Sequence, residues 1–178
     1  MSDYGGSATP QNQRDLWRTP VEIFNALDLE FGFYLDAAAS LENTLCSHFI
    51  NEKTNALKTE WVSYGSIWIN PPYSDITPWI LKAAEECRRQ RQPVVMLVPA
   101  DISVGWFSLA LRSVDEVRFI TDGRIQFIPE QDAGRRLSNP KGSMLFIWRP
   151  FINPRCQFTT VARDELIRMG SETNENAD

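Results

Sequence analysis

An apolar run, residues 67–69, is followed directly by Asn70-Pro71-Pro72-Tyr73, whose residue types suit a reactive or ligand-binding turn. Proline fixes its own φ and carries no backbone N–H, so this turn is stiff. Its exposed polar groups are therefore hydrogen-bond acceptors, namely the Asn70 amide oxygen and a backbone carbonyl. A flat aromatic ring, Tyr73, follows directly. Together these groups suit a planar ligand that carries an NH2 group.

A second candidate is Asp36, which ends another apolar run and precedes Ala37, Ala38 and Ala39. Small side chains let a bulky ligand approach the backbone closely, and a carboxylate accepts hydrogen bonds from a cationic or hydroxylated ligand. Each candidate also has a purely structural alternative, because Pro-Pro is common in turns and Asp is common at helix caps.

Other reactive side chains are few. His48 is the sole histidine and has no recognisable catalytic or metal-binding partner, so we interpret it as structural. Cys46, Cys87 and Cys156 are far apart and lack the spacing of a zinc site, so we expect buried, reduced thiols and no metal.

The elements that position both candidates are alternating helices and strands. Strands are expected in residues 31–40, ending near Asp36, and in residues 44–50, 65–70, 94–100, 116–120 and 142–149. Helices are expected in residues 19–31, with Thr19 as N-cap and Pro20 at the first helical position, and in residues 76–92 and 103–113. This alternation predicts an α/β fold with a doubly wound, mostly parallel sheet. Ligands of such sheets bind outside the carboxyl ends of the strands, where Asp36 and Asn70 fall.

The length of 178 residues favours one domain, which we place at residues 16–169. The polar residues 1–15 and 170–178 are expected to be flexible ends. No run of about 20 apolar residues and no secretory signal is present, so we expect no membrane partner and a cytoplasmic location.

The formal net charge is −5, yet the third quarter of the chain is basic and could face phosphate. A basic surface that is merely solvated is the alternative. The best candidate for a nucleic-acid contact is the polar loop 129–142. The cations that we single out for this role are Arg124, Arg135, Arg136 and Lys141.

The Asn-Pro-Pro-Tyr motif resembles the (Asp/Asn/Ser)-Pro-Pro-(Tyr/Phe) signature of methyltransferases that modify amino groups. The ordered set formed by residues 16–40, 55–57, 66–80, 94–100, 123–127 and 142–148 resembles the phage and prophage DNA N-6-adenine methyltransferase family of the Dam type. The resemblance covers roughly residues 15 to 150. It implies a Rossmann-like class I methyltransferase fold, S-adenosylmethionine as cofactor, and methylation of N6 of a flipped adenine, in a bacterial or phage-infected host cell.

The resemblance also implies cofactor contacts. Trp17, Thr19 and Pro20 match the motif that closes over the methionine end of the cofactor. Asp36 matches the carboxylate that receives the methionine amino group, with Ala37-Ala38 where related enzymes carry glycines.

Asn55 matches the position that recognises the cofactor adenine, and Glu52 is a candidate for the ribose hydroxyls. The chain departs from the wider class because it has no Gly-x-Gly after its first strand.

At the catalytic turn, Asn70 and the Pro71 carbonyl are expected to accept the hydrogens of the target amine, and Tyr73 to stack on the flipped base. Trp79 is a candidate for the opposite wall, with a core position as its alternative. A DNA partner is expected, and the oligomeric state is left open. RNA or protein-glutamine methylation, and a non-catalytic nucleic-acid-binding role, are the alternative functions.

Overall fold

The computed structural model describes residues 17–51, 54–129, 134–138, 140–151 and 156–175. Four helices are present in this part of the chain: α2 (Val21–Phe31), α3 (Thr77–Gln90), α4 (Gly105–Ala110) and α5 (Arg163–Glu175). The main sheet consists of β2 (Phe33–Asp36), β3 (His48–Phe49), β4 (Ser66–Ile69), β5 (Val94–Pro99), β6 (Glu116–Thr121), β9 (Ser143–Trp148) and β10 (Gln157–Ala162). A smaller sheet consists of β1 (Trp17–Arg18), β7 (Gln126–Pro129) and β8 (Leu137–Ser138).

The main sheet has seven strands in the order β10-β6-β9-β5-β4-β2-β3 within the described residues. Only β9 runs antiparallel to its neighbours, β5 and β6, and the other pairs are parallel. The prediction of a mixed α/β fold with a mostly parallel sheet is therefore confirmed. None of the helices in these residues has the length and apolar character needed to span a bilayer.

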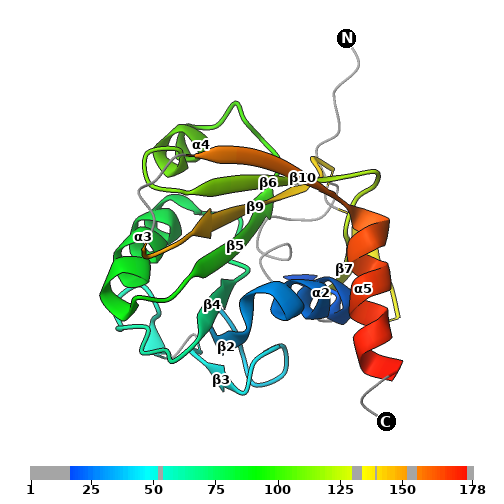
Figure 1. The fold of residues 1–178 in the computed structure, drawn as a ribbon, viewed down its shortest axis with the longest axis horizontal. Coiled ribbons are helices and arrows are strands. Elements are labelled where there is room, and N and C mark those ends of the chain that lie inside the picture. Colours follow the sequence, from blue (N-terminus) through cyan, green and yellow to red (C-terminus); the bar gives the residue numbers. More distant parts are fainter. Residues whose placement is uncertain (1–16, 52–53, 130–133, 139, 152–155, 176–178) are drawn as a thin grey trace.

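Helices cover both faces of the main sheet. Alternate residues of β5 point to opposite faces: Val94, Met96 and Val98 pack in the core cluster that includes α3 and α4. Val95 and Leu97 pack in the cluster that includes α2 and α5. Figure 1 shows α2 and α5 side by side, with α3 and α4 across the sheet from them. Burial on both faces explains why β5 is a continuous apolar run.

The pairing of β2 with β4 brings the two candidate turns together. These strands are parallel neighbours, with Asp36 opposite Trp68, and the Ala37 N–H donates to the Trp68 carbonyl at 3.0 Å. Asn70 lies just beyond the end of β4. The turns after Asp36 and after Ile69 consequently leave the same edge of the sheet at adjacent positions.

The first helix begins differently from the prediction. Pro20 occupies the N-cap position with an extended ψ of 137°, and the Ile23 and Phe24 N–H groups donate to its carbonyl. Thr19 therefore does not cap the helix, and its buried hydroxyl has no hydrogen-bond partner among the described residues. The predicted start of this helix lies one residue too early, because a proline marks the N-terminal end of a helix without fixing its first residue.

The C-terminal elements β10 and α5 were not predicted. β10 is an edge strand with largely exposed or half-buried residues, so its sequence lacks a strong apolar pattern. α5 continues to Glu175, so the expectation of a flexible tail from residue 170 is wrong for residues 170–175. Polar composition suggested the tail, whereas packing on α2 stabilises the helix.

The contact between α5 and α2 depends on a glycine. A Cβ atom at Gly170 would overlap the backbone carbonyl of Glu22 on α2. We expect Gly170→Ala to lower the free energy of unfolding by about 2 kcal/mol, as overpacking does elsewhere. Urea denaturation measures this loss. The matched control is Gly105→Ala in α4, where a Cβ meets nothing within 4 Å and stability should be unchanged or slightly higher. Equal effects of the two substitutions would contradict this interpretation of the helix contact.

Candidate active site

A cavity of about 490 Å³ opens where the turns after β2 and β4 meet. Of the residues singled out in the sequence, seven line it: Ala37, Ala38, Ala39, Asn55, Asn70, Pro72 and Trp79. These residues come from segments far apart in the chain, so the fold gathers most of the expected site around one space. The volume lies within the range of about 300–1,000 Å³ that is usual for small-molecule sites.

The Asn70 side chain has a defined orientation. Its Nδ2 donates to the backbone carbonyl of Trp17 at 3.1 Å. The reverse orientation of the amide would set Oδ1 against that carbonyl, so two acceptors would face each other. Oδ1 is therefore the group left available on the cavity side, and it has no hydrogen-bond partner among the described residues. An acceptor oxygen at this turn stays a prediction with which the orientation of the amide is consistent.

Tyr73 does not line the cavity. Its ring meets the Phe127 ring edge to face, with centroids 6.4 Å apart and planes at 89°. Its hydroxyl is buried without a hydrogen-bond partner in the described part of the chain, and burial raises the pKa of this phenol. Phe127 in turn stacks on Trp17 at 5.9 Å. The ring expected to meet a substrate thus belongs to a row of aromatic side chains next to the Asn70-Pro71-Pro72 turn.

Asp36 stabilises one wall of the cavity from a buried position. It is buried and is not among the lining residues. Its carboxylate accepts hydrogen bonds from the N–H groups of Ala38, at 3.3 Å, and Leu45, at 3.4 Å. Burial raises its pKa from 3.8 to about 6, against the lowering effect of these two hydrogen bonds. Asp36 thereby holds the loop between β2 and β3, which forms one wall.

Asn55 forms part of another wall in an unusual backbone conformation. Its φ is 50°, in the left-handed region, which Asn tolerates better than most residues. Its carbonyl accepts hydrogen bonds from the N–H groups of Lys58, at 2.9 Å, and Thr59, at 3.1 Å. Its side chain lines the cavity and makes no hydrogen bond within the described ranges. Glu52, expected nearby, lies outside the described residues.

The N-terminal candidates approach the site without lining it. Trp17, Thr19 and Pro20 are buried, and none of them belongs to the cavity wall. The connection runs instead through the Trp17 carbonyl to Asn70.

The basic candidates are distributed unevenly. Arg124, Arg135 and Arg136 are exposed, the latter two between β7 and β8. Lys141 forms an ion pair with Asp101, whose pKa is lowered to about 2 mainly by this hydrogen bond.

Part of the positive charge counted in the sequence is neutralised within the fold. Arg118 pairs with Glu30 and Glu116, and Arg149 pairs with Glu116. Arg118 and Arg149 are therefore engaged by the buried Glu116 within the fold, and Arg118 also by the exposed Glu30, so the candidates for phosphate contact narrow to the exposed cations Arg124, Arg135 and Arg136.

Several lining residues were missed by sequence analysis. They belong to the loop after β2 and to the segments that flank Asn55: Ser40, Glu42, Asn43, Ile50, Asn51, Ala56 and Leu57. Their one signal in the sequence was position, since they follow the carboxyl ends of β2 and β3. No cluster of three or more His, Cys, Asp and Glu side chains suited to a metal ion occurs in the residues that the structure describes.

Comparison with known proteins gives consistent matches. A family model described as DNA N-6-adenine-methyltransferase (Dam) matches residues 6–173. A DNA N-6-adenine-methyltransferase of Escherichia phage T1 is 38% identical over 161 residues, which cover 82% of this chain and 67% of the relative. A DNA N-6-adenine-methyltransferase of Haemophilus phage HP1 (strain HP1c1) is 34% identical over 146 residues, which cover 81% of this chain and 84% of the relative. The putative methyltransferase YfdM of Escherichia coli (strain K12) is 35% identical over 71 residues, which cover 36% of this chain and 74% of the relative.

The raised pKa of Asp36 predicts a pH dependence of stability. A carboxyl whose pKa is higher in the folded state than in the unfolded state contributes stability below the unfolded value of 3.8, and this contribution is lost as pH rises through about 6. The shift corresponds to about 3 kcal/mol. Asp36→Asn cannot ionise, so its free energy of unfolding should rise by about that amount relative to wild type between pH 4 and 7. Chemical denaturation across this range measures the difference. Parallel pH profiles would show that Asp36 does not titrate with a raised pKa.

Proposed function

The chain belongs to the DNA N-6-adenine-methyltransferase (Dam) family, and we propose that the cavity between the turns after β2 and β4 is where it transfers the methyl group. Its activity is methylation of the exocyclic N6 of adenine in DNA. The observation that carries the assignment of the site is the Asn70 amide, fixed by the Trp17 carbonyl at the cavity wall with its oxygen available.

The cofactor that we propose is S-adenosylmethionine, which supplies an electrophilic methyl group on a sulfonium when bound. The residues present suit it in size and chemistry. The alanines after Asp36 leave room for close approach to the backbone. Asn43, Asn51 and Asn55 add side chains that can pair with ribose hydroxyls or a purine edge.

We assign the methionine end of the cofactor to the Ala37-Ala38 turn and the adenine to the region of Asn55. The Asn55 amide is free to donate and accept at once, as recognition of an adenine edge requires. Asp36 is proposed to attract the methionine ammonium through the turn that it holds. Glu52 remains the proposed partner of the ribose hydroxyls. Trp17, Thr19 and Pro20 are proposed to close the methionine end from the side of β1.

The chemical difficulty lies in the target amine. Its lone pair is delocalised into the adenine ring, and the base is stacked inside the duplex. Flipping the base outward costs a few kcal/mol, which contacts in the pocket can recover. Asn70 Oδ1 and the Pro71 carbonyl are proposed to accept one amine hydrogen each, so that the nitrogen lone pair turns toward the methyl group. Alignment of this kind can be worth about 7–11 kcal/mol. The proton leaves to solvent after transfer.

Tyr73 is proposed to contact the flipped base through its ring. Because its hydroxyl is buried and the residue is half-buried, the ring rather than the hydroxyl is what it can offer. Phe127 supports the ring from behind. Stacking of a base on an aromatic side chain contributes about 1–3 kcal/mol. Trp79, which lines the cavity, is proposed as an opposing apolar surface.

The finer fold assignment is also a proposal. Helices on both faces, a mostly parallel sheet and a site at the carboxyl ends of β2 and β4 support a doubly wound, Rossmann-like class I methyltransferase domain.

DNA is proposed to contact the region between β7 and β8. Arg135 and Arg136 are exposed there, and β7 pairs with β1, whose Trp17 carbonyl binds Asn70. Arg124, just before β7, extends the same basic region. Lys141 can join it only by exchanging its pairing with Asp101 for a phosphate. Such contacts position the duplex and do not themselves read its sequence.

The role of Asn70 is tested by Asn70→Ala. Removing a preorganised hydrogen-bonding group from the reacting centre should lower kcat by at least about a hundredfold. Affinity for S-adenosylmethionine should change by no more than a few-fold. The measurement is incubation with labelled cofactor and unmethylated plasmid DNA, followed by nucleoside analysis for N6-methyladenosine. Asn174→Ala, a surface asparagine on α5, is the matched control and should retain activity. Turnover at the wild-type rate in Asn70→Ala would refute the assignment.

The role of the basic region is tested by the double variant Arg135→Ala/Arg136→Ala. Loss of two phosphate contacts should weaken DNA binding and reduce the slope of log K against log salt by about 2. Fluorescence anisotropy over a salt series measures this slope.

The control for net charge is Arg88→Ala/Arg112→Ala. These arginines are also exposed, but they precede β5 and β6 and so lie at the sheet edge opposite Asn70. The control should keep the wild-type slope. Identical slopes for both double variants would place the DNA elsewhere.

A further inference from the structure

One wall of the cavity is an irregular segment with no sheet or helix to hold it. Asn55, Ala56 and Leu57 line the cavity from this segment, between β3 and β4. Asn55 and Leu57 are exposed, and Asn55 has a left-handed backbone. Such a wall keeps its shape only if buried neighbours fix it, because loop backbone is otherwise free to move.

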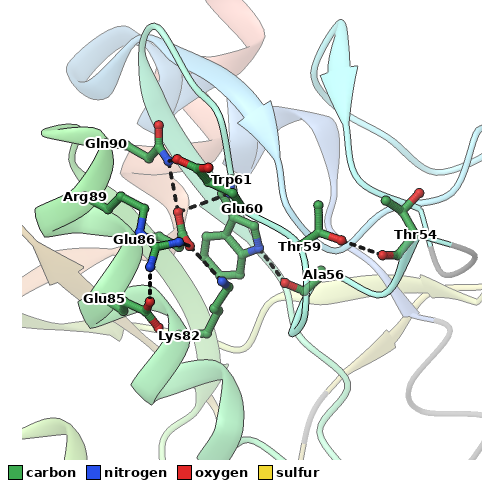
Figure 2. Close-up of polar contacts among 10 residues, drawn as sticks. All are labelled: Thr54, Ala56, Thr59, Glu60, Trp61, Lys82, Glu85, Glu86, Arg89 and Gln90. Atoms are coloured by element: carbon green, nitrogen blue, oxygen red, sulfur yellow. Dashed lines mark hydrogen bonds and ion pairs between the residues drawn. The ribbon is translucent and has the colours of Figure 1, made fainter.

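Trp61 supplies the fixed point. It is fully buried, and its indole Nε1 donates to the Ala56 carbonyl at 2.8 Å (Figure 2). Ala56 lines the cavity and follows Asn55 directly in the sequence. The indole therefore ties the middle of the wall to the protein core.

Trp61 is itself held by α3. Its backbone N–H donates to Glu86 Oε2 at 3.1 Å, as Figure 2 shows. Glu86 is fully buried, and it also accepts hydrogen bonds from Lys82 Nζ, at 2.7 Å, and Gln90 Nε2, at 3.1 Å.

The surroundings of Glu86 favour its ionised form. Burial alone would raise its pKa, but the hydrogen bonds from Lys82, Gln90 and the Trp61 N–H lower it. Lys82 also lies over the Trp61 indole at 6.0 Å from the ring centroid. A buried carboxylate with several donors costs much to disturb, so it makes a rigid anchor.

The same indole supports a second wall. The Trp61 and Trp79 rings lie with centroids 6.3 Å apart and planes at 33°. Trp79 lines the cavity from α3. Trp61 thus contacts both the 55–57 segment, through Ala56, and α3, through Trp79.

We propose that Trp61, anchored by Glu86, is a positioning residue that sets the width of the cofactor cavity and thereby the affinity for S-adenosylmethionine. It does not line the cavity and acts through Ala56 and Trp79. This inference rests on the proposed function, since it takes the cavity to be the cofactor site.

The test is Trp61→Phe, which keeps an aromatic ring in the core and removes the N–H that binds the Ala56 carbonyl. We expect the Kd for S-adenosylmethionine, measured by isothermal titration calorimetry, to rise about tenfold, the effect of one lost hydrogen bond of ordinary strength. The kcat at saturating cofactor and saturating DNA should stay near wild type, because the turn that carries Asn70 is untouched.

The matched control is Trp148→Phe. Trp148 is also buried in the same core cluster. Its indole N–H donates to Ser113 Oγ at 3.0 Å and its ring meets Phe146, and neither of these partners lines the cavity. The two variants should lose similar thermal stability, and only Trp61→Phe should lose cofactor affinity. Equal losses of affinity in both would show general loosening of the core and would overturn the proposal.

A measurement on the wild-type protein avoids the risk that a substituted variant fails to fold. Adding S-adenosylmethionine should shift the indole Nε1–H resonance of Trp61 and slow its exchange with solvent, while the Trp148 resonance stays in place. An unmoved Trp61 signal would also overturn the proposal.

Asn55→Gly separates this inference from the proposed function. Glycine keeps the left-handed backbone and removes only the side chain. Weak binding by Asn55→Gly with normal binding by Trp61→Phe would reject the positioning role and leave the cofactor site in place. Normal binding by both variants would reject the cofactor site itself.

Discussion

The hydrogen bond from Asn70 Nδ2 to the Trp17 carbonyl is the interaction on which the site depends. It joins the end of a central strand to the smaller sheet, since Trp17 belongs to β1 and β1 pairs with β7. It also decides which end of the amide faces the cavity. An asparagine at a solvated turn could present either end, whereas this one is oriented before any ligand arrives. Preorganisation of this kind matters for an amine substrate, because an acceptor that must first rotate loses part of its advantage.

The cavity is built from parts that differ in rigidity. The turn after β4 is stiffened by two prolines, and the turn after β2 is held by Asp36 from below. The 55–57 segment contains no proline and no such carboxylate. Its Ala56 carbonyl accepts a hydrogen bond from the buried Trp61 indole, and the Trp61 backbone N–H donates to Glu86. The aromatic row of Trp17, Phe127 and Tyr73 links the catalytic turn to the strand that leads to Arg135 and Arg136. The proposed DNA contact and the turn that carries Asn70 therefore share a structural connection.

The local sequence was sufficient where one pattern determined the outcome. The apolar run of β5 predicted a strand covered on both faces, and Asn70 and Pro72 of the Asn-Pro-Pro turn do line the cavity. It was insufficient where tertiary contacts decide. Nothing local shows that Glu86, on a charged helix, is buried by Trp61, Lys82 and Gln90. Likewise, the pairing of Lys141 with Asp101 and of Arg118 with Glu30 depends on residues far apart in the chain. α5 was missed because its stability comes from packing on α2 rather than from composition.

We propose that Asn70 Oδ1 and the Pro71 carbonyl receive the adenine amine beside the cofactor. A crystal structure of the protein with S-adenosylhomocysteine and a short duplex that contains its target adenine would test this. We expect a flipped adenine with N6 within hydrogen-bonding distance of Asn70 Oδ1, and an intact Asn70–Trp17 hydrogen bond. An adenine N6 bound elsewhere, or an Asn70 side chain turned away from the cavity, would contradict it.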